Sequence, residues 1–142
     1  MKKILVINGP NLNMLGIREP EIYGRTTYSG LVSMLETWGT ELGAEIKAFQ
    51  SNHEGAIIDE IQAAYGVFDG IVINPGGYTH TSVAIPDAIR AVGLPAVEVH
   101  ISDVDSREEY RRISYVSDAC IGVIKGKGLP GYREALEMLL KD

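Results

Sequence analysis

The sequence contains a single cysteine, Cys120, so no disulfide can form within the chain. This excludes the small disulfide-stapled folds and makes a reducing cytoplasm the expected compartment. No apolar run approaches the roughly 20 residues that a membrane-spanning helix needs. Met1, Lys2 and Lys3 precede only a short apolar run that lacks a small-residue cleavage site, so we expect no secretory signal.

Basic residues are also scarce, since 13 Lys and Arg against 19 Asp and Glu leave a formal net charge of −6. Nucleic acid and anionic membranes are therefore not expected as main partners. An anionic small molecule still fits, because a local group of arginines can override the net charge. The length of 142 residues, with 45% hydrophobic and 23% charged residues, is typical of one globular domain, which we assign to residues 1–142.

The motifs of several cofactor-dependent folds are missing. The loop after the first apolar run lacks the Gly-x-Gly-x-x-Gly pattern of dinucleotide-binding folds, and residues 126–128 are not a Walker A loop. Asn8 and Asn74 stand where a phospho-acceptor domain would need carboxylates, and no spacing of His, Cys and carboxylates predicts a metal site. Cys120 lies in an apolar run and is not expected to be a nucleophile. The sequence thus indicates acid–base chemistry by Tyr, His and Arg, without a metal or cofactor.

Apolar patterns of two kinds alternate along the chain. Runs that are apolar throughout predict buried parallel strands at residues 4–7, 70–73, 96–99 and 120–124, and the alternating run at 45–49 predicts a strand at the sheet edge. Apolar residues three and four apart predict helices at 31–42, 57–65, 84–92 and 132–140, with one or two helical turns at 107–112. This alternation predicts an α/β fold, a flavodoxin-like three-layer sandwich with a five-stranded parallel sheet.

Polar residues gather after the predicted strands, where ligands bind in open α/β sheets. His100 follows one strand, and Glu98, two residues earlier, points to the same face, as a general acid with an orienting carboxylate requires. The irregular segment 9–27 carries Arg18 and Tyr23, and we interpret it as a mobile lid. Further candidates in these segments are Asn11, Asn74, Gly77, His80, Ile101, Ser102, Arg107 and Arg111.

Each of these features also has a structural explanation. The Asn, Gly and Pro residues at 8–11 and 74–77 are turn formers, and Thr81 and Ser82 are suitable helix N-caps. Arg107, Arg111 and Arg112 are compatible with a solvated helix face.

Several strings of residues carry a family resemblance along nearly the whole chain: NGPNL at 8–12, REP at 18–20 with Tyr23, QSNHEG at 50–55, NPGGYTHTS at 74–82 and EVHIS at 98–102. They closely resemble the type II 3-dehydroquinate dehydratases. Departures from the family pattern are small, with Pro86 where a basic residue is common and Ile113 where a histidine is common. The resemblance implies a shikimate-pathway hydro-lyase for aromatic amino acid and chorismate biosynthesis. It further implies a cytoplasmic, cofactor-free homododecamer built from four trimers.

The same resemblance implies a role for each matching residue. Tyr23 is similar to the general base, His100 to the acid that protonates the leaving hydroxyl, Arg18 to the lid residue that stabilises the transition state, and Asn11 to the residue that holds a water near the enolate. Substrate-binding positions are Asn74, Gly77, His80, Ile101, Ser102 and Arg111, with Asp87 contributed by a neighbouring subunit and with Glu98 and Arg107 in support. A free tyrosine with a pKa of about 10 is a weak base at neutral pH, and arginines nearby would favour its phenolate.

Two other classes of function remain open from the residues alone. A non-catalytic ligand-binding module on the same fold would keep the Arg, His and Asn residues but would not need Tyr23. A structural or regulatory protein would leave the polar strand ends solvated. Among enzymes, Lys125 and Lys127 lie near a predicted strand end, where a Schiff-base mechanism would need a lysine. The pairing of Arg18 with Tyr23 and of Glu98 with His100 favours the dehydratase.

Overall fold

The computed structural model of the chain describes residues 1–17 and 19–141, with the backbone but not the side chain of Tyr23. Five parallel strands form one sheet in the order β2-β1-β3-β4-β5. The strands are β1 (Lys2–Asn8), β2 (Ala44–Gln50), β3 (Gly70–Asn74), β4 (Ala96–His100) and β5 (Gly122–Lys125). This is the strand order of flavodoxin-like folds, as the sequence predicts.

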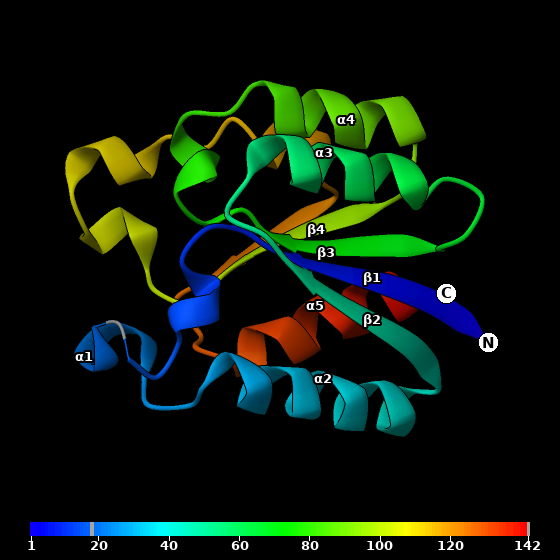
Figure 1. Ribbon diagram of the computed structural model, residues 1–142, viewed down its shortest axis with the longest axis horizontal. Coiled ribbons are helices and arrows are strands. Elements are labelled where there is room, and N and C mark those ends of the chain that lie inside the picture. The colour runs from blue at the N-terminus through cyan, green and yellow to red at the C-terminus, as the bar shows by residue number, and fades with distance from the viewer. Residues whose placement is uncertain (18, 142) are drawn as a thin grey trace.

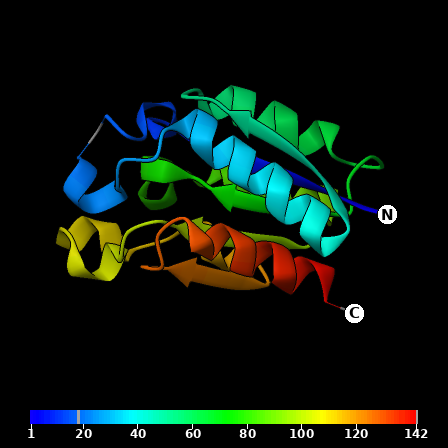
Figure 2. The ribbon, with the colours of Figure 1, turned by 90° about the horizontal axis from the view of Figure 1, so that it is seen from below.

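Helices cover both faces of the sheet and complete the three layers (Figure 1). One face carries α3 (Glu54–Ala63) and α4 (Ala84–Val92), and the other carries α2 (Tyr28–Leu42) and α5 (Pro130–Leu140). Figure 2 shows α2 and α5 side by side on the same face of the sheet. The fifth helix, α1 (Pro20–Tyr23), is short and lies outside these layers.

The two cores follow from the alternation of side chains along β1. Ile4 and Val6 face the core beneath α2 and α5, whereas Leu5 and Ile7 face the core beneath α3 and α4. All four side chains are at most 1% exposed, which explains why the run is apolar on both faces. The prediction that the alternating segment 45–49 forms an edge strand is confirmed, since β2 is the first strand of the sheet.

Two expectations from the sequence are wrong in detail. The apolar run at 120–124 is not a buried strand, because β5 is the other edge of the sheet, Cys120 and Ile121 precede it, and Ile121 is 62% exposed. Tyr65 does not belong to the buried stripe of α3, because that helix ends at Ala63 and Tyr65 is 71% exposed. In both places the apolar pattern of the sequence extends beyond the buried residues, so the apolar side chain there is exposed.

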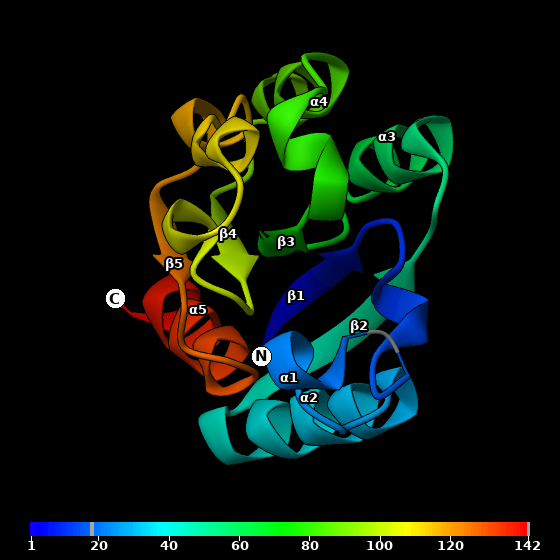
Figure 3. The same ribbon diagram turned by 90° about the vertical axis from the view of Figure 1, so that its left-hand side faces the viewer.

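The carboxyl ends of the strands meet at one edge of the sheet, which Figure 3 views directly. Four short 3-10 turns gather there, at Leu12–Met14, Gly76–His80, Val104–Ser106 and Glu109–Arg112, whereas the 3-10 turn Ser117–Ala119 precedes β5 and packs against α4. The expected helical turn within 107–112 is therefore present as a 3-10 turn, and the segment 9–27 holds one such turn and α1. No helix in the described part of the chain has the length and apolar character needed to span a bilayer.

Candidate active site

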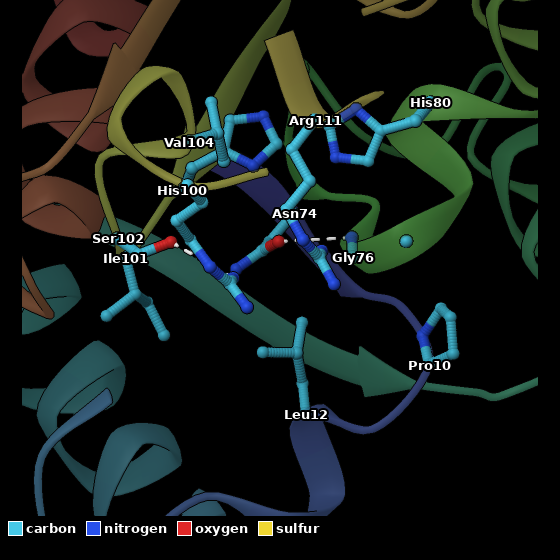
Figure 4. A pocket seen from close by; sticks show the side chains of 12 residues that line it. Pro10, Leu12, Asn74, Gly76, His80, His100, Ile101, Ser102, Val104 and Arg111 are labelled. Atoms are coloured by element: carbon cyan, nitrogen blue, oxygen red, sulfur yellow. Dashed lines mark hydrogen bonds between the residues drawn. The ribbon is translucent and has the colours of Figure 1, made fainter. Parts of the chain in front are cut away.

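A pocket opens at this edge of the sheet, between the loops that follow β1, β3 and β4 (Figure 4). It brings together eight of the residues that the sequence singled out. These are Asn74, Gly77, His80, His100, Ile101, Ser102, Arg107 and Arg111. In the view of Figure 4 both imidazole rings lie on the side of the pocket opposite Leu12.

His100 is held from behind by a buried carboxylate. Its Nε2 forms a hydrogen bond with Oε2 of Glu98, whose side chain is 1% exposed. Burial raises the pKa of Glu98, but the hydrogen bond and charge of His100 and two serine hydroxyls outweigh it, so the pKa lies below its ordinary range. Glu98 therefore stays a carboxylate, which can only accept, and Nε2 of His100 is the protonated nitrogen in this pair. The arrangement leaves Nδ1 as the ring nitrogen that a ligand can reach.

His80 has a defined tautomer for a similar reason. Its Nδ1 lies 2.6 Å from the carbonyl oxygen of Ile113, and a carbonyl can only accept, so Nδ1 carries the proton. Partial burial lowers the pKa of His80, and the charges of His100 and Arg111 lower it further, against the opposing effect of the Ile113 carbonyl. At neutral pH the ring is thus uncharged, and its Nε2 is a hydrogen-bond acceptor.

Two guanidinium groups give the pocket positive charge. Arg111 donates from Nε to Oε2 of Glu108 at 2.7 Å, and its Cζ lies 5.3 Å from the centre of the Tyr110 ring. Arg107 donates from Nη1 to Ser102 Oγ at 3.5 Å, and its Nη2 lies 3.8 Å from a carboxylate oxygen of Glu19. Both arginines are thereby oriented toward the pocket in a chain that is acidic overall.

Asn74 belongs to a buried polar network beneath the pocket. Its Nδ2 donates to the hydroxyl of Tyr132 at 2.9 Å, and that hydroxyl donates to Oδ1 of Asn8 at 2.6 Å. Its Oδ1 accepts from the backbone N–H of Gly76 at 3.2 Å. The network fixes which way the Asn74 amide points and ties the ends of β1 and β3 to α5.

Among the predicted site residues whose side chains the structure describes, three do not line this pocket: Asn11, Asp87 and Glu98, the last of which lies behind His100. Asn11 lies on its rim, where its backbone N–H donates to Oδ1 of Asn52 at 3.0 Å. Asp87 is on α4, largely exposed, 3.5 Å from Arg90. Arg18 lies outside the described residues, and Tyr23 is placed by its backbone alone, at the end of α1.

Sequence reasoning gave no role to several residues that shape the site. Pro10, Leu12, Gly76 and Val104 line the pocket, and the loops that carry them were already indicated by the strand-end rule. Ser114, Ser117 and Tyr132 act from distant parts of the sequence, and no spacing could have linked them to Glu98 or Asn74. Within the described part of the chain, no three His, Cys, Asp or Glu side chains lie together as metal ligands would.

Comparison with known proteins agrees with this site. Residues 2–140 match the family model described as "Dehydroquinase class II". The chain is 58% identical over 136 residues to "Catabolic 3-dehydroquinase 1" of Aspergillus terreus, covering 96% of this chain and 90% of that protein. It is also 58% identical over 130 residues to "3-dehydroquinate dehydratase" of Clostridium acetobutylicum, with 92% and 90% covered. 

A solved structure gives the same result in three dimensions. The type II dehydroquinase from Butyrivibrio crossotus superposes with a TM-score of 0.96 at 56% identity, covering 97% of each chain. The fold, the polar pocket and these similarities lead to one conclusion. The chain belongs to the type II 3-dehydroquinate dehydratases, a family of lyases.

Proposed function

We propose that this protein converts 3-dehydroquinate into 3-dehydroshikimate and water. The observation that carries the proposal is a buried imidazole, backed by a buried carboxylate, in a pocket that two arginines line. An elimination of water needs a group that delivers a proton to a leaving hydroxyl, and His100 has the position and the partner for that task. The family's matched length supports the same assignment.

The reaction is an anti elimination through an enolate. A base removes one proton from the carbon beside the substrate ketone, and the electron pair moves onto the ketone oxygen. The enolate then expels the hydroxyl, which takes a proton from Nδ1 of doubly protonated His100 and leaves as water, while Nε2 keeps the proton that it donates to Glu98. Asn11 is assigned the water that stabilises the developing negative charge, because donors placed where charge develops lower the barrier.

Tyr23 is the proposed base, and segment 9–27 is the proposed lid. Tyr23 is the last residue of α1, and Glu19 directly precedes that helix. Oε2 of Glu19 lies 3.8 Å from Nη2 of Arg107, which lines the pocket, so α1 starts close to the pocket. A guanidinium close to a phenol favours the phenolate, so Arg18 and Arg107 are the proposed source of its basicity. Base and acid then come from different loops and act on opposite faces of one ring.

The remaining pocket groups suit the substrate's hydroxyls and carboxylate. Neutral His80 offers an acceptor at Nε2, which fits a hydroxyl donor better than a carboxylate. The family resemblance implies that His80 and Ser102 together meet the carboxylate, and the acceptor at Nε2 argues against that role for His80. The carboxylate is assigned to Ser102 and the backbone near Ile101, with Asn74, Gly77 and Arg111 completing the substrate contacts.

A Schiff-base mechanism finds no suitable lysine among the described residues that line the pocket. Lys125 Nζ lies 2.7 Å from Asp105, and Lys127 Nζ lies 2.9 Å from Glu134. Both lysines are thus engaged by carboxylates, and neither lines the pocket where a Schiff base with the substrate would have to form. We therefore expect borohydride, added with substrate, to leave the enzyme active.

The test is an ultraviolet assay of the conjugated enone that forms when 3-dehydroquinate is added. We expect His100→Asn to lower kcat by about 10²- to 10⁴-fold, the range for loss of a general acid. His53→Asn is the matched control, because His53 lies outside the residues that line the pocket. Absence of turnover in the wild type, with substrate bound in calorimetry, would instead support a binding module, and absence of both would support a structural protein.

We further propose the family's trimer-based dodecamer as the working assembly. The carboxylate of Asp87 on α4 is exposed and does not line the pocket of its own chain. This is what we expect of a residue that contributes to the site of a neighbouring subunit. Light scattering with a parallel activity assay tests this, and a fully active monomer would refute it. A cytoplasmic place in the shikimate pathway is proposed with it. Deletion of the gene should then produce a requirement for aromatic amino acids.

A further inference from the structure

Glu98 is surrounded by more hydrogen-bond donors than its partner His100 alone. Its Oε1 accepts from Ser117 Oγ at 2.8 Å and from Ser114 Oγ at 3.2 Å. Its Oε2 accepts from Ser114 Oγ at 3.1 Å in addition to the imidazole. Ser114 lies in the loop between the 3-10 turns Glu109–Arg112 and Ser117–Ala119, and Ser117 is the first residue of the second turn, so both hydroxyls come from outside β4. A buried carboxylate is costly without such donors.

The loop that supplies these hydroxyls is itself held in place. The Ser114 oxygen accepts the backbone N–H groups of Val116 and Ser117 at 3.2 and 3.1 Å, so its proton is directed away from them toward Glu98. The Tyr115 N–H donates to the Thr79 carbonyl at 3.0 Å, and the Val116 side chain is fully buried in the core beneath α3 and α4. The hydroxyls therefore meet Glu98 from a fixed loop.

The same loop also contacts the second pocket histidine. The carbonyl of Ile113 accepts the Nδ1 proton of His80, directly before the residue whose hydroxyl meets Glu98. His80 comes from the loop after β3, and His100 comes from the end of β4. Residues 113–117 are a third segment, which bonds directly to His80 and to Glu98, the partner of His100. Side chains that fix ring orientation behind a reacting group are a common feature of active sites.

We infer that residues 113–117 are a positioning segment that sets the ring orientation and the protonated nitrogen of both pocket histidines, with Ser114 and Ser117 acting on His100 through Glu98. Neither serine lines the pocket. The inference rests on the proposed function for its kinetic consequence, because it concerns the acid His100. Its structural content, the state of the two imidazole rings, does not depend on turnover.

The consequence for pH follows from the groups around Glu98. The carboxylate faces His100 on its own strand, both serines of the positioning segment, and the thiol of Cys120, whose pKa burial and the charge of Glu98 raise to about 12. The charge of Glu98 also acts on His80, whose pKa it raises against the larger lowering effect of burial. Removing the serine hydroxyls removes groups that lower the pKa of Glu98, so Glu98 becomes protonated at a higher pH. Activity that needs the carboxylate is then lost sooner as the pH falls.

The experiment compares Ser114→Ala, Ser117→Ala and the double variant with Ser114→Thr and Ser117→Thr. We expect the double alanine variant to lower kcat by about 10- to 100-fold, the effect of losing hydrogen bonds to a charged group, with little change in KM. The acid limb of its pH–rate profile should move to higher pH, and the threonine variants should restore both. Ser82→Ala is the matched control, because the buried Ser82 hydroxyl accepts from the Ile85 N–H and does not contact Glu98.

A second readout is independent of activity and of protein size. Solid-state ¹⁵N NMR of histidine-labelled protein reports which ring nitrogen carries the proton. We expect the wild type to carry a proton on the nitrogen of His100 that faces Glu98, Nε2, and on Nδ1 of His80, and we expect a changed His100 resonance in the serine-to-alanine variants alone. If the double variant does not fold, each single alanine variant still removes one of the two donors.

Two results would overturn the inference. The first is a wild-type kcat, profile and His100 resonance in the alanine variants. The second is a lower kcat in the alanine variants that the threonine variants do not restore, with the pH–rate profile and the His100 resonance unchanged. That result would indicate that the serines contribute through packing alone. If instead His100→Asn retains turnover, the proposed acid fails, while the resonances still decide whether the segment positions the rings.

Discussion

The two sides of the pocket differ in how firmly their polar groups are held. On the strand side, Asn74, Glu98 and His100 are 3%, 1% and 5% exposed, and each takes part in hydrogen bonds with other buried or half-buried groups. The other side, the lid side, is formed by segment 9–27, the proposed lid. There Asn11 and Glu19 are exposed and have left-handed backbone angles, with φ of 71° and 40°. The strand side is preorganised, whereas the lid side holds backbone conformations that non-glycine residues seldom adopt.

This difference suits a reaction in which the substrate must enter and water must be excluded. The proposed proton donor, His100, is oriented without substrate, because its hydrogen bond to Glu98 is buried with it. The proposed base lies on segment 9–27, the proposed lid, so on this proposal its geometry is completed only when the lid closes. Mutations on the two sides should therefore affect different quantities, and the following predictions test that from the largest effect to the smallest.

Tyr23→Phe should have the largest effect on turnover. Loss of the proposed base should lower kcat by about 10²- to 10⁴-fold while substrate still binds. The free energy of unfolding should change little, because α1 has only four residues and lies outside the packed layers. Steady-state kinetics and urea unfolding measure the two quantities. Wild-type turnover would remove Tyr23 from the mechanism.

Glu98→Gln tests the strand side. We expect kcat to fall by about 10- to 100-fold, because a neutral amide cannot support the positive imidazole as the carboxylate does. The pKa of Glu98 is below its ordinary range, so the carboxylate contributes stability above that range and loses it as the pH falls through the folded-state value. Urea unfolding at decreasing pH should thus show a shallower loss of stability in the variant. Identical slopes would argue against an ionised, stabilised Glu98.

Tyr132→Phe makes the same chemical change as Tyr23→Phe, but in the buried network beneath the pocket. It removes a fully buried hydroxyl that accepts from Asn74 and donates to Asn8. We expect unfolding to become easier by about 1–3 kcal/mol, because two buried amide groups lose their partner. The loss of kcat should be far smaller than for Tyr23→Phe. A larger kinetic than thermodynamic effect would mean that Tyr132 serves catalysis more than the fold.

Glu19→Ala should have the smallest effect on stability. The carboxylate of Glu19 is 42% exposed and 3.8 Å from Arg107, and such surface ion pairs contribute only about 0–1 kcal/mol. We expect the urea midpoint to stay close to that of the wild type and to respond weakly to salt. A loss above about 2 kcal/mol would show that the lid side is held as firmly as the strand side.

The sequence predicted the parts of the fold that depend on local periodicity. The run at 4–7 gave a buried central strand, the stripe from Leu31 to Leu42 gave α2, and Gly43 ends that helix with a φ of 75°. It failed where the apolar pattern continued past the buried region, at Tyr65 and at Ile121. Periodicity reports which side chains are apolar, but burial depends on what packs against them.

The candidate site was predicted in the same uneven way. The pairing of Glu98 with His100 was accessible because residues two apart on a strand share a face, and the strand-end rule located the pocket. The hydroxyls of Ser114 and Ser117 and the carbonyl of Ile113 were not accessible, because a loop brings them to Glu98 and His80. Their sequence neighbours carry no pattern that distinguishes them from surface residues.

By itself, the sequence determined the α/β class, the edge of the sheet where the pocket lies and the pairing of Glu98 with His100, because local spacing sets which face and which end a residue occupies. Only the tertiary structure decided which distant groups complete that pair. Tyr132 meets Asn8 across 124 residues, and Ser117 meets Glu98 across 19. Such contacts form when layers and loops pack in three dimensions, and neither periodicity nor spacing encodes them.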